Sequence, residues 1–276
     1  MSEDKKPKKK KKAGDIFLTI VLIAAICIFC YAAYNLYHIY TEYKKGSDEY
    51  NAIAQMAVTE RDPDQDSTSE SEEAAGPDGP ALKAPLDIDF DSLRSINTDV
   101  IGWIYVEALD GVSYPVVKGT DNDQYLHLTY EKNYNFAGTI FIDYENKRDF
   151  SDCNTLVYGH NMKDGTMFSD LLQYKRESFW EQHRIIRFDT LTAQAEYTVM
   201  AVFWGEAEDL FAYYQFFDAE TSQEFAAYVD ACKDAALYET GVTAAYGDKL
   251  ITLSTCDDSG KNSRVVVVAK RITEAR

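Results

Sequence analysis

The chain has 276 residues, of which 13% are aromatic, and a formal net charge of −18. This length suits one sizeable domain with additional segments, or two small domains. Seven lysines lie within the first twelve residues, whereas the chain from residue 41 onward carries 21 basic and 43 acidic residues. Because so acidic a body repels phosphate backbones, the composition argues against nucleic acid as a partner.

One apolar segment near the N-terminus predicts a transmembrane anchor over residues 16–40. Nineteen residues from Ile16 to Tyr34 carry no charge, and a membrane-spanning helix needs about 20 mostly apolar residues. Since lysines are retained in the cytoplasm, residues 1–15 are predicted to be a cytoplasmic basic tail, with the rest of the chain outside the cell. The alternative is a cleaved signal peptide, but its apolar core is shorter and ends in small residues, whereas this run ends in tyrosines.

A juxtamembrane segment and a flexible acidic linker are predicted over residues 41–85. Residues 42–57 are able to continue the helix, whereas residues 62–73 are acidic and lack the apolar groups needed to offset chain entropy. Four carboxylates of the acidic stretch fall at the spacing of an EF-hand calcium loop. Because Ser67 replaces the turn glycine and no amphipathic helix follows, chance spacing in a tether is the favoured interpretation.

The remaining residues, 86–276, show the pattern of a globular domain that is mostly β. Short runs rich in β-branched and aromatic residues alternate with turn residues, which is typical of a single barrel or sandwich. Helices are expected over residues 87–96 and over residues 219–238, the latter between the sixth and seventh strands. The eight strands are expected at 100–106, 114–117, 139–142, 155–158, 185–188, 197–204, 250–253 and 265–269.

Three cysteines belong to this domain, Cys153, Cys232 and Cys256, and an odd number leaves at least one thiol free unless it pairs between chains. Cys256 is placed at the end of a predicted strand, and Arg264 opens the next strand after a loop. Two antiparallel strands joined by that loop would bring these two residues together at one sheet end. The sequence offers no Cys/His cluster with zinc-ligand spacing.

His160 follows another predicted strand, beside a glycine that allows a tight turn. A thiolate attacks a carbonyl, an imidazole moves the proton, and a guanidinium binds the developing oxyanion, so Cys256, His160 and Arg264 are candidates for acyl transfer. Each also has an ordinary interpretation as a small core residue, a structural histidine or a solvated charge. Geometry decides between these interpretations.

Several motifs resemble those of the sortase family. The segment Thr252-Leu253-Ser254-Thr255-Cys256 matches the signature T-L-x-T-C, and Arg264 follows on the next strand. The resemblance covers about residues 86–272 and is strongest to class B sortases. The further matching motifs are Gly102-Trp103-Ile104, Tyr114-Pro115-Val116-Val117, Asp121-Asn122 with Tyr125-Leu126, Ala137 to Asp143, and Tyr158-Gly159-His160-Asn161-Met162.

The resemblance implies an eight-stranded sortase-type β-barrel with an N-terminal helix and a long helix before strand 7. It implies cleavage of the C-terminal sorting signal of surface proteins after Thr, through a thioacyl-enzyme on Cys256. An amino nucleophile from a cell-wall precursor or a pilin would release the acyl group, and no metal or cofactor is needed. His160 would be the general acid and base, and Arg264 the clamp for oxyanion and substrate. By matched position, Ser254, Asn122 and Leu126 would line the substrate groove.

Two features depart from the expected pattern. Asp257 and Asp258 follow the nucleophile directly, and their negative charge disfavours a thiolate unless His160 or Arg264 offsets it. His127 stands where a different polar residue is expected; a surface histidine is favoured over a second catalytic one.

Other functions remain open from the sequence. An L,D-transpeptidase would carry S-x-G-C at its nucleophile, and a papain-like enzyme would carry its cysteine before its histidine. An anchored binding module would use the same barrel with Cys256 inert, since fold does not fix function. A pilin-polymerising sortase often carries an Asp-Pro-aromatic lid motif, which Asp62-Pro63-Asp64 matches poorly.

Overall fold

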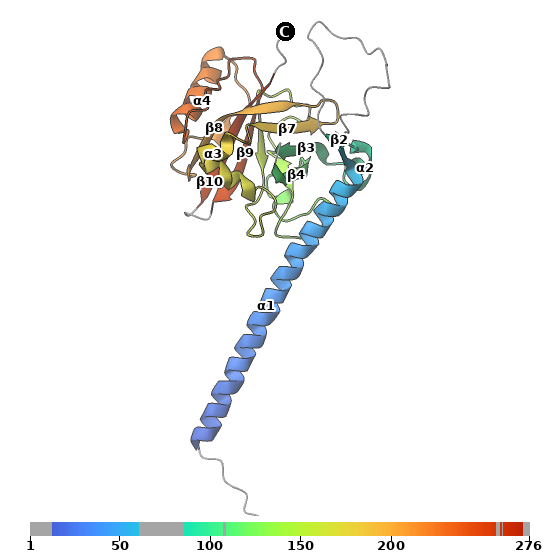
Figure 1. Ribbon diagram of the computed structural model, residues 1–276, viewed down its shortest axis with the longest axis vertical. Helices are drawn as coiled ribbons and strands as arrows, with labels where there is room; N and C mark the ends of the chain where they lie inside the picture. The colour runs from blue at the N-terminus through green and yellow to red at the C-terminus, as the bar shows by residue number, and fades with distance from the viewer. Residues whose placement is uncertain (1–12, 61–85, 107–108, 258–259, 261, 273–276) are drawn as a thin grey trace, which may run out of the picture. The chain divides into compact units, whose positions relative to one another are not determined.

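The computed structural model describes residues 13–60, 86–106, 109–257, 260 and 262–272 (Figure 1). The predicted basic tail and most of the acidic linker, including the carboxylates at calcium-loop spacing, lie outside these residues. The chain divides into two compact units, Met1–Lys45 and Gly46–Arg276.

The first helix, α1 (Ala13–Ala57), contains the predicted anchor. Its apolar side chains between Ile16 and Tyr40 are largely exposed. Among the described residues it is the one helix long and apolar enough to cross a membrane. The helix also continues through residues 42–57, as the sequence predicts, because no proline interrupts that stretch.

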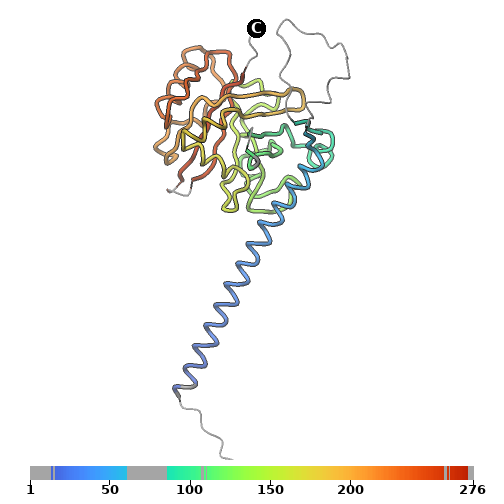
Figure 2. Tube along the Cα trace, viewed as in Figure 1, coloured from blue at the N-terminus to red at the C-terminus, as the bar shows by residue number. Residues whose placement is uncertain are grey.

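Eight strands close into a barrel in the order β10-β8-β7-β3-β4-β5-β6-β9 (Figures 1 and 2). All eight predicted strands are confirmed, most of them one to several residues longer than expected. Closure removes the free sheet edges that would otherwise attract another chain. The strands are β3 (Val100–Val106), β4 (Leu109–Val117), β5 (Ile140–Ile142), β6 (Asn154–Tyr158), β7 (Ile185–Thr190), β8 (Glu196–Glu206), β9 (Leu250–Asp257) and β10 (Ser263–Arg271).

The predicted long helix is α4 (Ser222–Ala235), which covers the outer face of the barrel at β8. Thr221 and Glu224 form a capping box that fixes its first turn. Its buried residues, among them Phe225 and Tyr228, form a hydrophobic core with Val266 and Val268 of β10. The other elements are β1 (Val58–Glu60), β2 (Leu86–Ile88), α2 (Phe90–Ile96), η2 (Gln124–Leu126), η3 (Ser169–Lys175), α3 (Glu177–Trp180) and η4 (Tyr213–Gln215).

The folded unit that holds the barrel begins at Gly46, earlier than the predicted start at Leu86. Tyr50, Ile53 and Ala57 at the end of α1 are buried, and β1 pairs with β2 as a small antiparallel sheet. No pattern in the sequence predicts this strand pair, because three-residue strands have too few positions to show a period.

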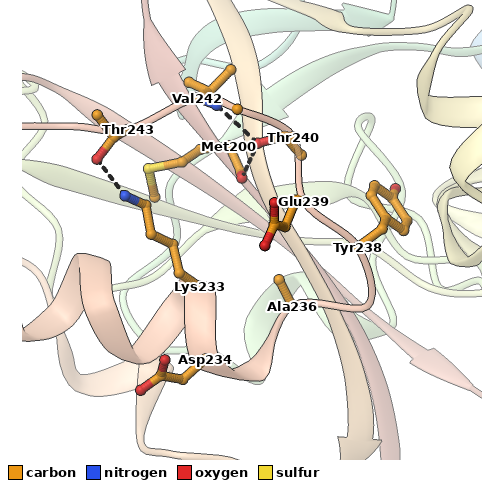
Figure 3. A pocket seen from close by; sticks show the side chains of 10 residues that line it. Met200, Lys233, Asp234, Ala236, Tyr238, Glu239, Thr240, Val242 and Thr243 are labelled. Carbon is orange, nitrogen blue, oxygen red and sulfur yellow. Dashed lines mark hydrogen bonds between the residues drawn. The ribbon is translucent and has the colours of Figure 1, made fainter.

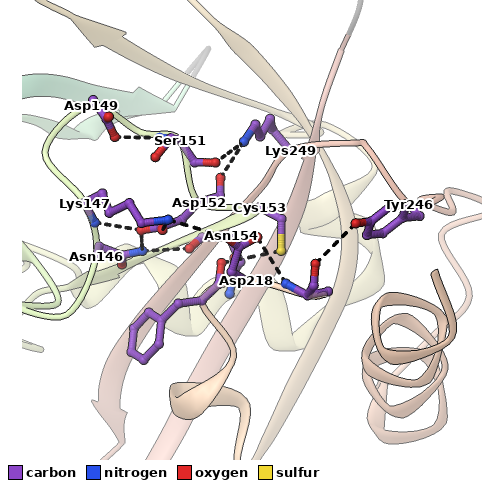
Figure 4. A network of polar contacts seen from close by, with 12 residues as sticks. Asn146, Lys147, Asp149, Ser151, Asp152, Cys153, Asn154, Asp218, Tyr246 and Lys249 are labelled. Carbon is purple, nitrogen blue, oxygen red and sulfur yellow. Dashed lines mark hydrogen bonds and ion pairs between the residues drawn. The ribbon is translucent and has the colours of Figure 1, made fainter. Parts of the chain in front are cut away.

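A polar network fixes the register between β6 and β9 at their first residues (Figure 4). Lys249, just before β9, donates to the carbonyls of Ser151 and Asp152 at 2.5 and 2.8 Å. The Asn146 side chain bonds Asp152 and the Asn154 carbonyl from the other side, at 2.9 and 2.8 Å. These bonds tie both strands to one turn, so a slip of one strand against the other would break several of them at once.

Gly159 continues the course of β6 toward the next residue, His160. Its N–H donates to the Ser254 carbonyl at 3.3 Å, and its own carbonyl accepts from the Thr255 hydroxyl at 2.8 Å. A Cβ at this position would lie 2.7 Å from the ring of Phe168 and would also collide with Ile140. Close packing therefore demands glycine here.

We expect Gly159→Ala to lower the free energy of unfolding by about 1–3 kcal/mol, the usual cost of overpacking a well-filled site. Thermal unfolding measures this loss. Gly205→Ala is the matched control, because its Cβ would meet only the flexible side chain of Leu210, at 3.2 Å. Equal midpoints for the two variants would contradict the packing argument.

Candidate active site

Three neighbouring strands bring the predicted catalytic residues to one end of the barrel. The parallel pair β6 and β9 sets Tyr158 opposite Ser254, and the antiparallel pair β9 and β10 sets Cys256 opposite Arg264. His160 follows Tyr158 by two residues, just as Cys256 follows Ser254. Since paired strands lie about 4.8 Å apart, Cys256 and Arg264 lie side by side on β9 and β10. His160 lies just past the end of β6, after Gly159, which is still bonded to Ser254 and Thr255 of β9. These three residues are called the candidate catalytic row. The predicted proximity of Cys256 and Arg264 is confirmed.

The three cysteines of the folded unit differ in exposure. Cys256 is exposed, whereas Cys153 and Cys232 are buried. Burial raises the pKa of both buried thiols to about 12, so they remain protonated at neutral pH. The Cys153 thiol donates to the Phe217 carbonyl at 3.4 Å, a contact that suits a structural role. Only Cys256, of these three, is accessible to a substrate.

The His160 ring is held by the loop between β4 and β5. Its Nε2 lies 2.9 Å from the Leu126 carbonyl oxygen. A carbonyl oxygen only accepts, so Nε2 carries the proton and Nδ1 is the ring atom able to accept one. Burial lowers the pKa of His160; the bond to Leu126 opposes this effect and the neighbouring His127 adds to it. Burial therefore favours the neutral imidazole, with Nδ1 as its proton acceptor.

His127 is exposed, as the sequence predicts, and its ring stacks on His160 with centroids 6.2 Å apart. The contact makes it a neighbour of the site. Tyr134 extends this group of rings, because its centroid lies 6.1 Å from that of His127.

A buried tyrosine that the sequence did not single out is hydrogen-bonded to β9, the strand that carries Cys256. The Tyr213 hydroxyl lies 3.0 Å from the Ser254 hydroxyl. Burial raises the pKa of Tyr213, while the charge of Arg264 lowers it and that of Cys256 raises it. The Tyr213 hydroxyl is therefore near enough to Arg264 and Cys256 for their charges to affect it. No pattern in the sequence around residue 213 predicts the contact, because it joins η4 to β9 across a long separation.

The charge of Asp257, beside Cys256, is compensated by Lys175. Asp257 is buried and forms an ion pair with the Lys175 ammonium. The same ammonium lies 4.5 Å from the ring centroid of Trp204, a favourable cation–π distance. The compensation anticipated from His160 or Arg264 therefore comes from a third residue. Asp258 lies outside the described residues.

The three predicted groove residues have different surroundings. Leu126 is half-buried and lies beside His160 through its carbonyl. Ser254 is buried and bonded to Tyr213. The Asn122 amide donates to Asp143 at 2.9 Å and accepts from the Tyr144 N–H at 3.0 Å. Of the three, Leu126 has the most direct contact with the candidate catalytic row.

A surface pocket of about 480 Å³ lies elsewhere, at the end of α4 (Figure 3). Its wall is tied together by Lys233 bonding Thr243 at 2.6 Å and by Thr240 bonding the Met200 carbonyl at 2.5 Å. None of the candidate catalytic row lines it, so this pocket is separate from that row.

Comparisons with known proteins agree with this geometry. The model of the sortase domain family matches residues 104–272. The chain belongs to the sortase family. Sortase B of Staphylococcus aureus is 35% identical over 185 residues, which cover 66% of this chain and 74% of that protein. Sortase B of Listeria monocytogenes is 35% identical over 184 residues, covering 66% and 73%.

Solved sortase structures share the barrel. Sortase B of Clostridium perfringens has a TM-score of 0.63 at 32% identity, covering 67% of this chain and 100% of that one. Sortase B of Bacillus anthracis has a TM-score of 0.68 at 28% identity, covering 85% and 99%. The predicted class B sortase fold and cysteine transpeptidase activity are confirmed, and the L,D-transpeptidase and papain-like alternatives no longer apply.

We expect Lys175→Met to slow alkylation of the sortase thiol Cys256 near neutral pH by about tenfold, because a neighbouring carboxylate left uncompensated disfavours the thiolate. Iodoacetamide labelling read by peptide mass spectrometry measures the rate. The double variant Lys175→Met/Asp257→Asn removes both charges and should recover most of the rate. A double variant as slow as the single one would show that charge is not the cause.

The buried His160 also predicts a pH dependence of stability. Its pKa lies below the ordinary value of 6.5, so the unfolded chain binds more protons than the folded one as the pH falls below 6.5. Acidification through that window lowers the free energy of unfolding, and this contribution vanishes above it. As the pH is lowered from about 8 to about 5, the melting midpoint should decrease less steeply for His160→Gln than for wild type. His183→Gln is the control, since that ring stacks on Phe179 outside the row.

Proposed function

We propose that this sortase is a membrane-anchored enzyme that cleaves the C-terminal sorting signal of surface proteins after a threonine. It transfers the acyl group to an amino nucleophile, with a cell-wall precursor as the acceptor. The observation that carries the proposal is the row of His160, Cys256 and Arg264 across the ends of β6, β9 and β10. A peptide laid across that end would meet a nucleophile, a base and a cation in one line.

The proposed reaction has two halves. Cys256 attacks the threonine carbonyl carbon while His160 takes the thiol proton at Nδ1, and Arg264 donates hydrogen bonds to the oxyanion. The intermediate then collapses: the C–N bond breaks, His160 returns its proton to the leaving amine, and a thioester to Cys256 remains. In the second half the acceptor amine attacks the thioester carbonyl carbon and loses a proton to His160; the C–S bond breaks, an amide forms, and His160 returns the proton to the Cys256 sulfur.

Two related solved structures support the two proposed substrates, the sorting signal and the amino acceptor. One is a Staphylococcus aureus sortase B–substrate complex, at 34% identity and a TM-score of 0.62. The other is a sortase B complexed with triglycine, at 35% identity and a TM-score of 0.62. Triglycine carries a free α-amine, so the chemistry of that ligand matches an amino acceptor.

The proposed topology places the N-terminus in the cytoplasm and the catalytic domain, residues 86–276 with the end of α1, outside the cell. It is supported by the apolar first part of α1 and by the lysines that precede it. An anchor of this kind would hold the enzyme at the surface where sorting signals and cell-wall precursors emerge.

We further propose that Leu126, Ser254 and Asn122 shape the substrate groove. Leu126 would contact the substrate directly, because it borders His160. Ser254 would act through Tyr213, and Asn122 by fixing the Asp143–Tyr144 turn.

The test uses the full chain in detergent with a library of fluorogenic sorting-signal peptides and a triglycine acceptor. We expect cleavage after threonine, a thioacyl adduct on Cys256 by mass spectrometry, and a transpeptidation product with the acceptor. Cys256→Ala should abolish all three. His160→Ala and Arg264→Ala should each lower the rate by at least about 100-fold, the scale seen when a proton-transfer group or an oxyanion donor is removed.

Cys153→Ala is the matched control, because it removes a buried thiol outside the row. Cleavage without any transfer to amines would contradict the transpeptidase half of the proposal. A folded protein that neither cuts the library nor forms an adduct would indicate an anchored binding module with an inert Cys256.

A further inference from the structure

The end of α1 contacts the loop that connects β4 to β5, residues 118–139. The Tyr50 hydroxyl donates to the Gly138 carbonyl at 2.5 Å and lies 3.1 Å from the Thr139 hydroxyl. Its ring packs edge-on against Tyr114, with centroids 5.5 Å apart. Tyr50 is buried, so this is an interior contact between the helix and the loop.

Two further residues of α1 extend the contact along the same loop. Glu49 accepts a hydrogen bond from the Glu131 N–H at 2.9 Å, and burial raises the pKa of its carboxyl. Gly46 also faces this loop, because a Cβ on it would lie 3.5 Å from the Asn135 side-chain amide, an ordinary packing distance. Residues three and four apart share one face of a helix, so one face of α1 lies along the loop.

The far side of Gly138 touches the peptide that holds the His160 ring. A Cβ on Gly138, whose φ is +60°, would lie 2.5 Å from the Tyr125 carbonyl oxygen and 2.6 Å from that of Leu126. The next residue, Thr139, donates its N–H to the Tyr125 carbonyl at 3.0 Å. The peptide bonded by Tyr50 therefore lies directly against the Leu126 carbonyl, which accepts from His160 Nε2.

We propose that Tyr50 is a positioning residue for His160, and that the end of α1, Gly46–Ala57, is a structural part of the active site. The connection runs from the Tyr50 hydroxyl to the Gly138 peptide, then to the Leu126 carbonyl, then to the imidazole. By holding that carbonyl in place, Tyr50 keeps the proton of His160 on Nε2 and leaves Nδ1 to serve Cys256. The inference rests on the proposed role of His160 and adds a residue from the helix that carries the anchor.

Two other arrangements would make Tyr50 irrelevant to chemistry. If the tyrosine only stabilised the fold, its loss would lower the melting temperature and leave His160 unchanged. If the Leu126 carbonyl set the His160 tautomer without help from the helix, the loss would again leave the imidazole unchanged. Measuring which ring nitrogen of His160 carries the proton distinguishes both of these arrangements from the proposal.

The experiment uses the full chain in detergent, labelled with ¹⁵N-histidine, and compares wild type with Tyr50→Phe. The phenylalanine variant keeps the ring and removes the hydroxyl. Nitrogen shifts report which ring atom of His160 is protonated, and His160→Gln assigns the signal. We expect the Nε2-protonated form to dominate in wild type, and a measurable share of the Nδ1-protonated form to emerge in Tyr50→Phe.

The kinetic arm uses the peptide selected in the cleavage screen. Tyr50→Phe should lower kcat by about fivefold, the size expected for one hydrogen bond, with KM unchanged, because the variant does not touch the substrate. Tyr174→Phe is the matched control: it also loses a buried hydroxyl that donates to a backbone carbonyl, that of His183 at 2.7 Å. It should change neither kcat nor the His160 signal.

If Tyr50→Phe fails to fold, Thr139→Val perturbs the same contact, since the Thr139 hydroxyl accepts from the Tyr50 hydroxyl at 3.1 Å and the Thr139 N–H bonds the Tyr125 carbonyl next to Leu126; Thr139→Ser then serves as the rescue. An unchanged His160 tautomer and an unchanged kcat in a folded Tyr50→Phe or Thr139→Val protein would overturn the inference. Full activity in His160→Gln would instead overturn the proposed function, so the two failures are distinguishable.

Discussion

The proposed active site depends on the parallel pairing of β6 with β9. That pairing joins segments almost one hundred residues apart, and its register sets Tyr158 against Ser254. A shift of one residue would turn every side chain to the opposite face, removing His160 from the neighbourhood of Cys256. The bonds from Lys249 and Asn146 at the start of the two strands oppose that shift, so a polar turn at one end of the barrel fixes the geometry of the candidate catalytic row at the other.

Charged side chains surround Cys256, although the protein as a whole is acidic. A chain with a formal charge of −18 is a poor setting for a thiolate, and Asp257 directly follows Cys256. The Lys175 ammonium compensates the carboxylate of the buried Asp257. Arg264 pairs with Cys256 on the neighbouring strand β10. The two positive groups beside β9, Lys175 and Arg264, therefore come from η3 and β10, elements that only the folded barrel brings together.

The loop between β4 and β5 links the site to the rest of the folded unit. One of its carbonyls, at Leu126, holds His160, and its Asn122 bonds the turn after β5. Its other side lies against the end of α1 through Tyr50 and Glu49. Bonds on both sides restrain this loop, which suits a segment that positions His160, the proposed base.

Local sequence pattern was enough to locate the elements and to select the candidates for chemistry. Runs rich in β-branched and aromatic residues located all eight strands, and an uncharged run located the apolar part of α1. The motif ending at Cys256 selected that residue with Arg264, and a separate strand-end motif, Tyr158-Gly159-His160, selected the histidine. Strand and helix periods repeat within a few residues, so a short window records them.

The tertiary structure alone decided which distant side chains complete the site. Lys175 neutralises Asp257, Tyr213 supports Ser254, and Tyr50 of α1 reaches the loop behind His160. Each of these contacts joins residues separated by 40 residues or more. The sequence does not reveal them, because no local period records which distant side chain will complete a buried pair.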